Sequence, residues 1–284
     1  MSMPPRIRYV LDHPLRFTLQ VFRGFHASRG FLLASAVAYN TLLSIVPILA
    51  LSLIALSQFM DRELLLETTG RYLALVAPGQ AGILKQQLVT FLDNWKVVGV
   101  VGVVMLLFFS SFAFAMLENA MAVIFKHRTE NKTRQLWVSV IIPYAYLLVL
   151  GAALFVLSAV IAGLAALGDT NAGRGWSLAE HQTTVIYMLG IAGETLLFTS
   201  LYVVMPRGRI PLGHAFIGGI TAALLWEGMR RVLVWYFASL SIVNVVYGTF
   251  ATVIIILLSL EAAAVIFLLG AQVIAEYEHI EPPP

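Results

Sequence analysis

Acidic residues interrupt several long apolar stretches of the sequence, and two of them have no base nearby. Glu194 and Glu261 lie near the middle of such stretches, without a Lys or Arg within four residues on either side. A charged side chain at the centre of a bilayer is costly unless it faces water or a partner. Each carboxyl group must therefore face water, contact another helix or be protonated. A Glu that takes up and releases protons in a water-accessible cavity would couple proton movement to solute movement. The alternative is a neutral Glu that forms a hydrogen bond to a neighbouring helix.

A third acid, Glu227, has bases close to it in the sequence. Arg230 and Arg231 follow it by three and four residues, and side chains at these spacings are neighbours on an α-helix. Two interpretations stay open. The group is either a latch that holds the helices together or a site that meets a charged group of a substrate.

Other polar residues in the apolar stretches could line the same interior. Tyr39 and Asn40 precede Pro47 by eight and seven residues. A proline inside a helix frees a carbonyl group one turn earlier and bends the helix, so we predict a kink at Pro47. Tyr39 and Asn40 then either line the polar interior or serve helix packing. Glu118 and Asn119 form a polar pair that we expect at the cytoplasmic end of their helix.

Composition indicates that all these residues lie on membrane-spanning helices. Hydrophobic residues make up 60% of the 284 residues and charged residues 12%, which is about half the charged share of ordinary soluble domains. A helix needs about 20 mainly apolar residues to cross the hydrocarbon core. We therefore predict an all-α, polytopic membrane protein with a single domain over residues 1–284 and six transmembrane helices. These are Phe31–Met60, Val97–Phe125, Leu136–Leu167, Thr184–Met205, Leu212–Val234 and Val246–Ala275.

The distribution of Lys and Arg predicts the orientation. With the amino terminus inside, the cytoplasmic segments carry eleven of the 18 basic residues, in agreement with the positive-inside rule. Both termini are then cytoplasmic, as a basic segment at 1–29 and an acidic tail at 276–284.

Two connecting segments show an amphipathic helical pattern. In the first outer loop, apolar residues recur at three- and four-residue steps from Leu84 to Trp95, which predicts either packing against the bundle and the membrane interface or a lid over an outward cavity. Near the amino terminus, Leu15, Leu19 and Phe22 share one face while Arg16 and Arg23 project elsewhere. This second pattern is typical of a helix anchored beside anionic lipids.

The sequence lacks the residues and motifs that several classes of function require. There is no cysteine, and the six His are scattered singly, so we expect no metal and no cofactor. Phosphate-binding loops, nucleophile elbows and dinucleotide-binding glycine motifs are absent from the sequence, and we therefore expect no enzyme. Membrane orientation already explains the basic residues, so nucleic acid is not an expected partner.

Three stretches, which together span most of the chain, carry recognisable patterns. They are ASAVAYNTLLSIVPIL (Ala34–Leu49, with Ala38, Tyr39, Leu42, Ser44 and Pro47), HAFIGGITAALLWEGMRRVLVWY (His214–Tyr236, with Gly219, Glu227 and Arg230) and VYGTFATVIIILLSLEAAAVIFLLGAQVI (Val246–Ile274, with Tyr247, Gly248, Gly270 and Ala271). These patterns resemble those of the YihY/BrkB family of bacterial inner-membrane proteins. The chain departs from the family pattern at Ser259, Glu261 and Gln272.

The resemblance implies a six-helix inner-membrane protein with both termini in the cytoplasm. Such sequences have also carried a ribonuclease BN label. Since no soluble segment here gathers the acids or histidines that phosphodiester hydrolysis requires, we expect no ribonuclease activity.

Together these observations predict a membrane transporter or flippase. Its substrate would be an amphipathic or anionic solute, including a lipid-linked one, and its movement would be coupled to protons. The pathway would be lined by Tyr39, Asn40, Glu194, Glu227, Arg230, Arg231 and Glu261. The alternative is a non-transporting envelope protein that organises lipids or partner proteins and whose acids are structural. The expected partners are membrane lipids and an unidentified solute. The sequence alone does not predict an oligomeric state.

Overall fold

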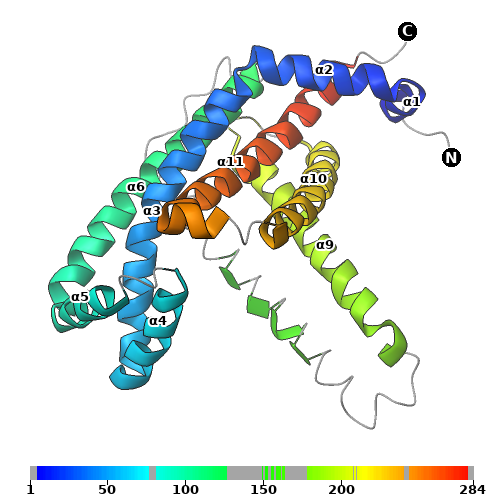
Figure 1. Cartoon of the computed structure of the whole chain (residues 1–284). Helices are drawn as coiled ribbons and strands as arrows, with labels where there is room; N and C mark the ends of the chain where they lie inside the picture. Colours follow the sequence, from blue (N-terminus) through cyan, green and yellow to red (C-terminus); the bar gives the residue numbers. More distant parts are fainter. Residues whose placement is uncertain are drawn as a thin grey trace. The chain divides into compact units, whose positions relative to one another are not determined.

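A computed structural model describes residues 5–76, 81–126, 178–206, 208, 210–239 and 243–280, together with short pieces between 149 and 163. All regular secondary structure assigned in these ranges is α-helical, which confirms the all-α fold class (Figure 1). The helices are α1 (Pro5–Asp12), α2 (Pro14–Ala27), α3 (Gly30–Phe59), α4 (Arg62–Val76), α5 (Ala81–Asp93), α6 (Trp95–Ile124), α9 (Leu178–Val204), α10 (Leu212–Ser239) and α11 (Val243–His279).

Four of these helices contain a segment long and apolar enough to cross a membrane. These segments are Gly30–Phe59, Trp95–Ile124, Tyr187–Val204 and Ile254–His279. They coincide with four of the six predicted spans. The predicted span Leu212–Val234 corresponds to α10, which is helical throughout. The predicted span Leu136–Leu167 lies mostly outside the described residues, so the number six stays a prediction.

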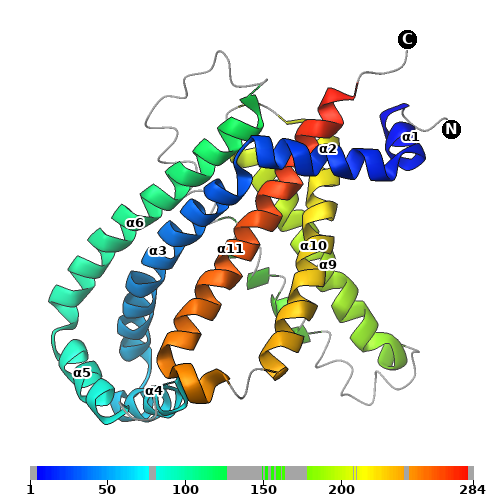
Figure 2. The ribbon, with the colours of Figure 1, turned by 45° about the horizontal axis from the view of Figure 1, so that its top comes forward.

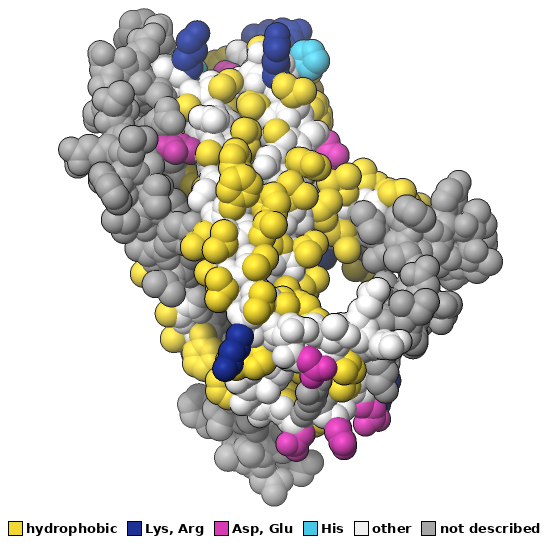
Figure 3. Space-filling view, turned by 90° about the vertical axis from the view of Figure 1, so that its left-hand side faces the viewer, with side chains coloured by type: hydrophobic (Ala, Val, Ile, Leu, Met, Phe, Trp, Pro, Cys, Tyr) yellow, Lys and Arg dark blue, Asp and Glu magenta, His cyan; other side chains and the backbone are white. Residues whose placement is uncertain are grey.

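The helices gather in two compact units. The first unit contains Met1–Gly30, Glu118–Glu227 and Ile266–Pro284, and the second contains Phe31–Leu117 and Gly228–Val265. In the second unit, hydrophobic side chains cover the visible face along the long helices, and acidic side chains appear at the end where α4 and α5 lie (Figure 3). Exposed aliphatic side chains on α6, such as Val97, Val100 and Val104, suit contact with lipid.

The predicted amphipathic segment of the outer loop forms α5 and packs against α4. Leu88 and Leu92 are buried together with Leu65 of α4, and Phe91 and Leu53 of α3 border this cluster. With Leu66, which also packs here, six apolar side chains are removed from water by contacts within the chain. The contacts favour the packing interpretation of this segment over a free lid.

In the first unit, α2 lies across the carboxyl-terminal end of α11 (Figure 1, Figure 2). Phe17 and Val21 of α2 form a buried cluster with Val273 and Tyr277 of α11. The helix α11 continues to His279, so its last turns include residues that the sequence pattern assigned to the acidic tail. This end of α11 is therefore a packed support for α2.

The same unit contains a seam in which α9, α10 and α11 approach at glycines. A Cβ atom added at Gly218 of α10 would lie 2.9 Å from the carbonyl oxygen of Gly270 on α11. Tyr202 of α9 is fully buried, donates a hydrogen bond of 2.7 Å to the carbonyl oxygen of Phe267 and stacks on the ring of Phe267. Between helices in lipid, such close backbone packing replaces the hydrophobic effect as the source of association.

Gly218→Ala should destabilise the protein, because the new methyl group would meet backbone that cannot move aside. Overpacking of this kind costs about 1–3 kcal/mol, which should appear as a lower midpoint of thermal unfolding in detergent. Gly228→Ala on the same helix is the matched control, since a Cβ atom there would have no neighbour within 4 Å in the described part of the chain. Equal stability of the two variants would contradict this view of the seam.

Candidate membrane-embedded polar site

The carboxyl group of Glu261 has a hydroxyl partner on another helix. The Oγ atom of Ser35 on α3 lies 2.6 Å from Oε1 of Glu261 on α11, and also 3.0 Å from the carbonyl oxygen of Phe31. Ser35 is exposed and Glu261 is half-buried in the second unit. No ion pair joins Glu261 to another described residue. Of the three alternatives that the sequence left open for this acid, this contact corresponds to an approach to another helix.

A hydroxyl group is a special partner because it can reverse its role. When Glu261 is ionised, Ser35 donates its proton to the carboxylate. When Glu261 is protonated, the acid can donate to the oxygen of Ser35, and Ser35 can donate to the carbonyl oxygen of Phe31. Both protonation states of Glu261 therefore find a hydrogen bond without movement of a helix.

In the first unit, Glu227 has a phenol partner. The hydroxyl of Tyr187 on α9 donates a hydrogen bond of 2.5 Å to Oε1 of Glu227 on α10. This interhelical contact was not expected from the sequence, which indicated only the bases that follow Glu227 on α10. Those bases, Arg230 and Arg231, are exposed in the next turn of the helix.

Glu194 is half-buried on the same helix as Tyr187, and its Oε2 atom is fully buried. Seven residues separate Tyr187 and Glu194, so both side chains project from one face of α9, roughly 10 Å apart along its axis. The adjacent turns of α9 contact α10, because a Cβ atom at Gly219 would lie 3.0 Å from the carbonyl oxygen of Thr195. Glu194 and Glu227 thus belong to the same part of the first unit.

The remaining predicted residues show ordinary helical surroundings. Asn40 donates through Nδ2 to the carbonyl oxygen of Ala36, 2.8 Å away on its own helix, which favours the helix-packing interpretation for its amide. Tyr39 is 57% exposed. Pro47 is buried, and α3 continues through it. Among the residues that the structure describes, no hydrogen bond joins any of these three side chains to Glu261.

Glu118 and Asn119 lie in the last two turns of α6. Glu118 is half-buried and Asn119 is exposed. Their assignment to the cytoplasmic side stays a prediction.

The sequence did not predict several hydrogen-bond partners of acidic residues. Ser35 and Tyr187 were missed because each is far from its glutamate along the chain. A third pair joins Nδ1 of His214 to Oε1 of Glu278 at 2.9 Å, beside the ring of Tyr277. For Tyr187, the spacing of seven residues from Glu194 was a usable signal. For Ser35 and His214 the sequence offers none.

Within the described ranges, no group of three or more His, Asp or Glu side chains is placed to hold a metal ion. The polar contacts at Glu227 and Glu261 involve hydroxyl groups, which are hydrogen-bond partners rather than the usual ligands of transition metals.

Comparison with known proteins places the chain in a family. A family model described as Virulence factor BrkB matches residues 21–283. The chain belongs to the BrkB family. This result confirms the resemblance that the three sequence stretches indicated.

Relatives of this BrkB-family protein include several that are named as membrane proteins. A UPF0761 membrane protein of Azotobacter vinelandii is 29% identical over 92% of this chain and 62% of its own length. Others are found in Alkalilimnicola ehrlichii, with 29% identity over 94% of this chain and 58% of the relative, and in Legionella pneumophila, with 27% identity over 93% and 62%. The BrkB-family chain thus spans about three fifths of the length of these relatives. No solved structure matches it.

These names and the four apolar helices identify the chain as a membrane protein. The names state no activity. Any role for the BrkB-family protein must therefore be argued from its polar residues.

We predict that the phenol of Tyr187 and the carboxyl of Glu227 stabilise the protein jointly. In a double-mutant cycle with Tyr187→Phe and Glu227→Gln, the coupling free energy should be about 0.5–2 kcal/mol, as for other interhelical hydrogen bonds in membranes. Thermal unfolding in detergent measures it. Tyr39→Phe is the control, because that exposed phenol has no hydrogen bond to a described residue, and it should leave stability unchanged. Additive effects of the two changes would show that the bond contributes nothing.

Proposed function

We propose that this BrkB-family protein is a transporter or flippase that moves an amphipathic or anionic solute, including a lipid-linked one, with proton coupling. The observation that carries the proposal is the contact between Ser35 and Glu261. An acid that is held by a hydroxyl within an apolar span, and that no described base pairs with, is suited to changing its protonation state. Ionisable residues at such positions are functional in most membrane proteins.

The two bases that follow Glu227 on α10 are the second part of the proposal. Arg230 and Arg231 are exposed, and guanidinium groups bind phosphate and carboxylate in a bidentate manner. An anionic headgroup would meet these groups, while Glu194, Glu227 and Glu261 would exchange protons. We place the protein in the bacterial inner membrane with both termini in the cytoplasm, and we assign it no catalytic activity.

A second candidate function is supported by the contact between Tyr187 and Glu227. A short hydrogen bond that joins two helices is what a structural latch requires. In this case the protein would organise lipids or partner proteins without transport. The two candidates differ in measurable ways, because structural acids affect stability whereas coupling acids affect flux.

The test uses the full chain in vesicles that contain fluorescent phosphatidylglycerol and an internal pH dye. We expect the wild-type protein to move the labelled lipid between leaflets when a pH gradient is imposed, with an accompanying change in internal pH. Glu261→Gln cannot release a proton and should reduce the gradient-dependent movement to the level of protein-free vesicles. Ser35→Thr keeps the hydroxyl and should retain most of the movement.

Glu63→Gln is the matched control, since this acid on α4 is exposed and should leave lipid movement unchanged. Full movement by both Glu261→Gln and Glu194→Gln would remove these acids from the mechanism. Absence of any gradient-dependent movement by the wild-type protein would contradict proton-coupled lipid transport. A lowered unfolding temperature of the Glu variants in that case would favour the structural candidate.

A further inference from the structure

The surface of α2 is divided into three stripes that run along the helix. Each stripe follows steps of three or four residues, which keep side chains on one face. The buried stripe packs on α11, and the other two stripes are exposed. The buried stripe is Phe17, Val21 and Phe25, the apolar exposed stripe is Leu15, Leu19 and Phe22, and the polar stripe is Arg16, Gln20 and Arg23.

The apolar exposed stripe has the character of a membrane contact. Leu15 is 80% exposed, Leu19 is 55% exposed and Phe22 is 52% exposed. Full burial of a large apolar side chain stabilises a protein by about 1.5–3 kcal/mol relative to exposure in water. Three such side chains in a row are therefore costly to leave in water. The apolar edge of the lipid headgroup region would cover them.

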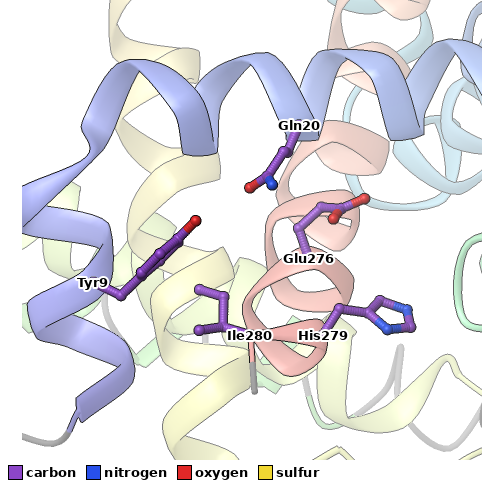
Figure 4. A pocket seen from close by; sticks show the side chains of 5 residues that line it. All are labelled: Tyr9, Gln20, Glu276, His279 and Ile280. Atoms are coloured by element: carbon purple, nitrogen blue, oxygen red, sulfur yellow. The ribbon is translucent and has the colours of Figure 1, made fainter. Parts of the chain in front are cut away.

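The polar stripe borders this apolar stripe and leads to a pocket. Arg16 and Arg23 are exposed, and neither forms an ion pair with a described residue. Gln20 lies between them and lines a pocket of about 310 Å³ with Tyr9, Glu276, His279 and Ile280. Figure 4 shows the amide of Gln20 and the hydroxyl of Tyr9 directed towards the space between α1, α2 and the end of α11.

The carboxyl of Glu276 is held in place at this pocket. Its Oε1 atom accepts a hydrogen bond of 3.0 Å from the amide of Gln272, a residue that is only 4% exposed. Both side chains reach α2 because Gly24 has no side chain, since an added Cβ atom there would collide with them. The pocket thus has a fixed hydrogen-bond acceptor, and the two exposed bases precede and follow its lining residue Gln20 on the polar stripe of α2.

We propose that α2 and this pocket bind a phospholipid whose headgroup joins a phosphate to free hydroxyl groups, as in phosphatidylglycerol. The guanidinium groups of Arg16 and Arg23 pair with the phosphate. The glycerol hydroxyls donate hydrogen bonds to the carboxylate of Glu276 and to the amide oxygen of Gln20. The acyl chains extend along Leu15, Leu19 and Phe22. This inference does not depend on transport by the protein.

Glu276 also gives the pocket a basis for selection. A headgroup that carries its own carboxylate, as in phosphatidylserine, would place like charges together in the pocket. The ammonium group of phosphatidylethanolamine can pair with Glu276 but repels the two arginines, so this lipid, which has no net charge, lacks the net attraction that phosphatidylglycerol has for the site. We therefore expect phosphatidylglycerol to bind more tightly than either of these lipids.

The experiment is a competition between the three lipids on the full-length protein in detergent, with bound lipids counted by native mass spectrometry. The double variant Arg16→Gln with Arg23→Gln should bind phosphatidylglycerol on the order of tenfold more weakly, since each base near a lipid surface contributes appreciably. Glu276→Gln should bring the affinities for phosphatidylglycerol and phosphatidylserine closer together. Arg71→Gln on α4, which removes an exposed base paired with Glu67, should change nothing.

A second measurement reports where α2 lies. Because the chain has no cysteine, a fluorophore on Leu19→Cys can be placed at a single position, and phosphatidylglycerol brominated on its acyl chains should quench it in vesicles. Equal binding of the three lipids by the wild type would overturn the proposal. So would unchanged binding by the double arginine variant. A label that bromine does not quench would show that protein, rather than lipid, covers the apolar stripe.

Discussion

The removal of a carboxyl group from water is the physical constraint on which the interior of this protein depends. A glutamate on an apolar helix must acquire a hydrogen-bond donor, and a donor on another helix also fixes how the two helices pack. The hydroxyls of Ser35 and Tyr187 meet this need for Glu261 and Glu227. These neutral donors satisfy an acid without adding a permanent charge to the helix interface. Helix packing and chemical capacity therefore have the same origin at these positions.

Much of the helical framework could be predicted from sequence, because apolar length is a local property. The predicted span Phe31–Met60 differs from α3 by one residue at each end, and Val97–Phe125 differs from α6 by two and one. The predicted amphipathic helices near the amino terminus and in the outer loop are also present. Charge and periodicity over neighbouring residues suffice for such predictions.

The partners of the acids could not be predicted in this way. Tyr187 and Glu227 are 40 residues apart, and Ser35 and Glu261 are 226 residues apart, so only the packing of the helices brings them together. Only the bases that follow Glu227 on its own helix could be predicted, because neighbours at three and four residues can be inferred without knowledge of the fold. In the same way, the sequence predicted that Glu276 and Glu278 belong to a charged tail. In the structure, both lie on α11, which continues to His279.

The glycine seam in the first unit limits how the protein can move. A helix that packs through Gly218 or Gly270 has a neighbouring carbonyl oxygen where a side chain would be, and the phenol of Tyr202 closes the same junction. Rotation of α10 about its axis would drive a larger residue into that backbone. Sliding by part of a turn would have the same effect. A change of shape that preserves this seam would therefore keep the packed parts of α9, α10 and α11 within the first unit together.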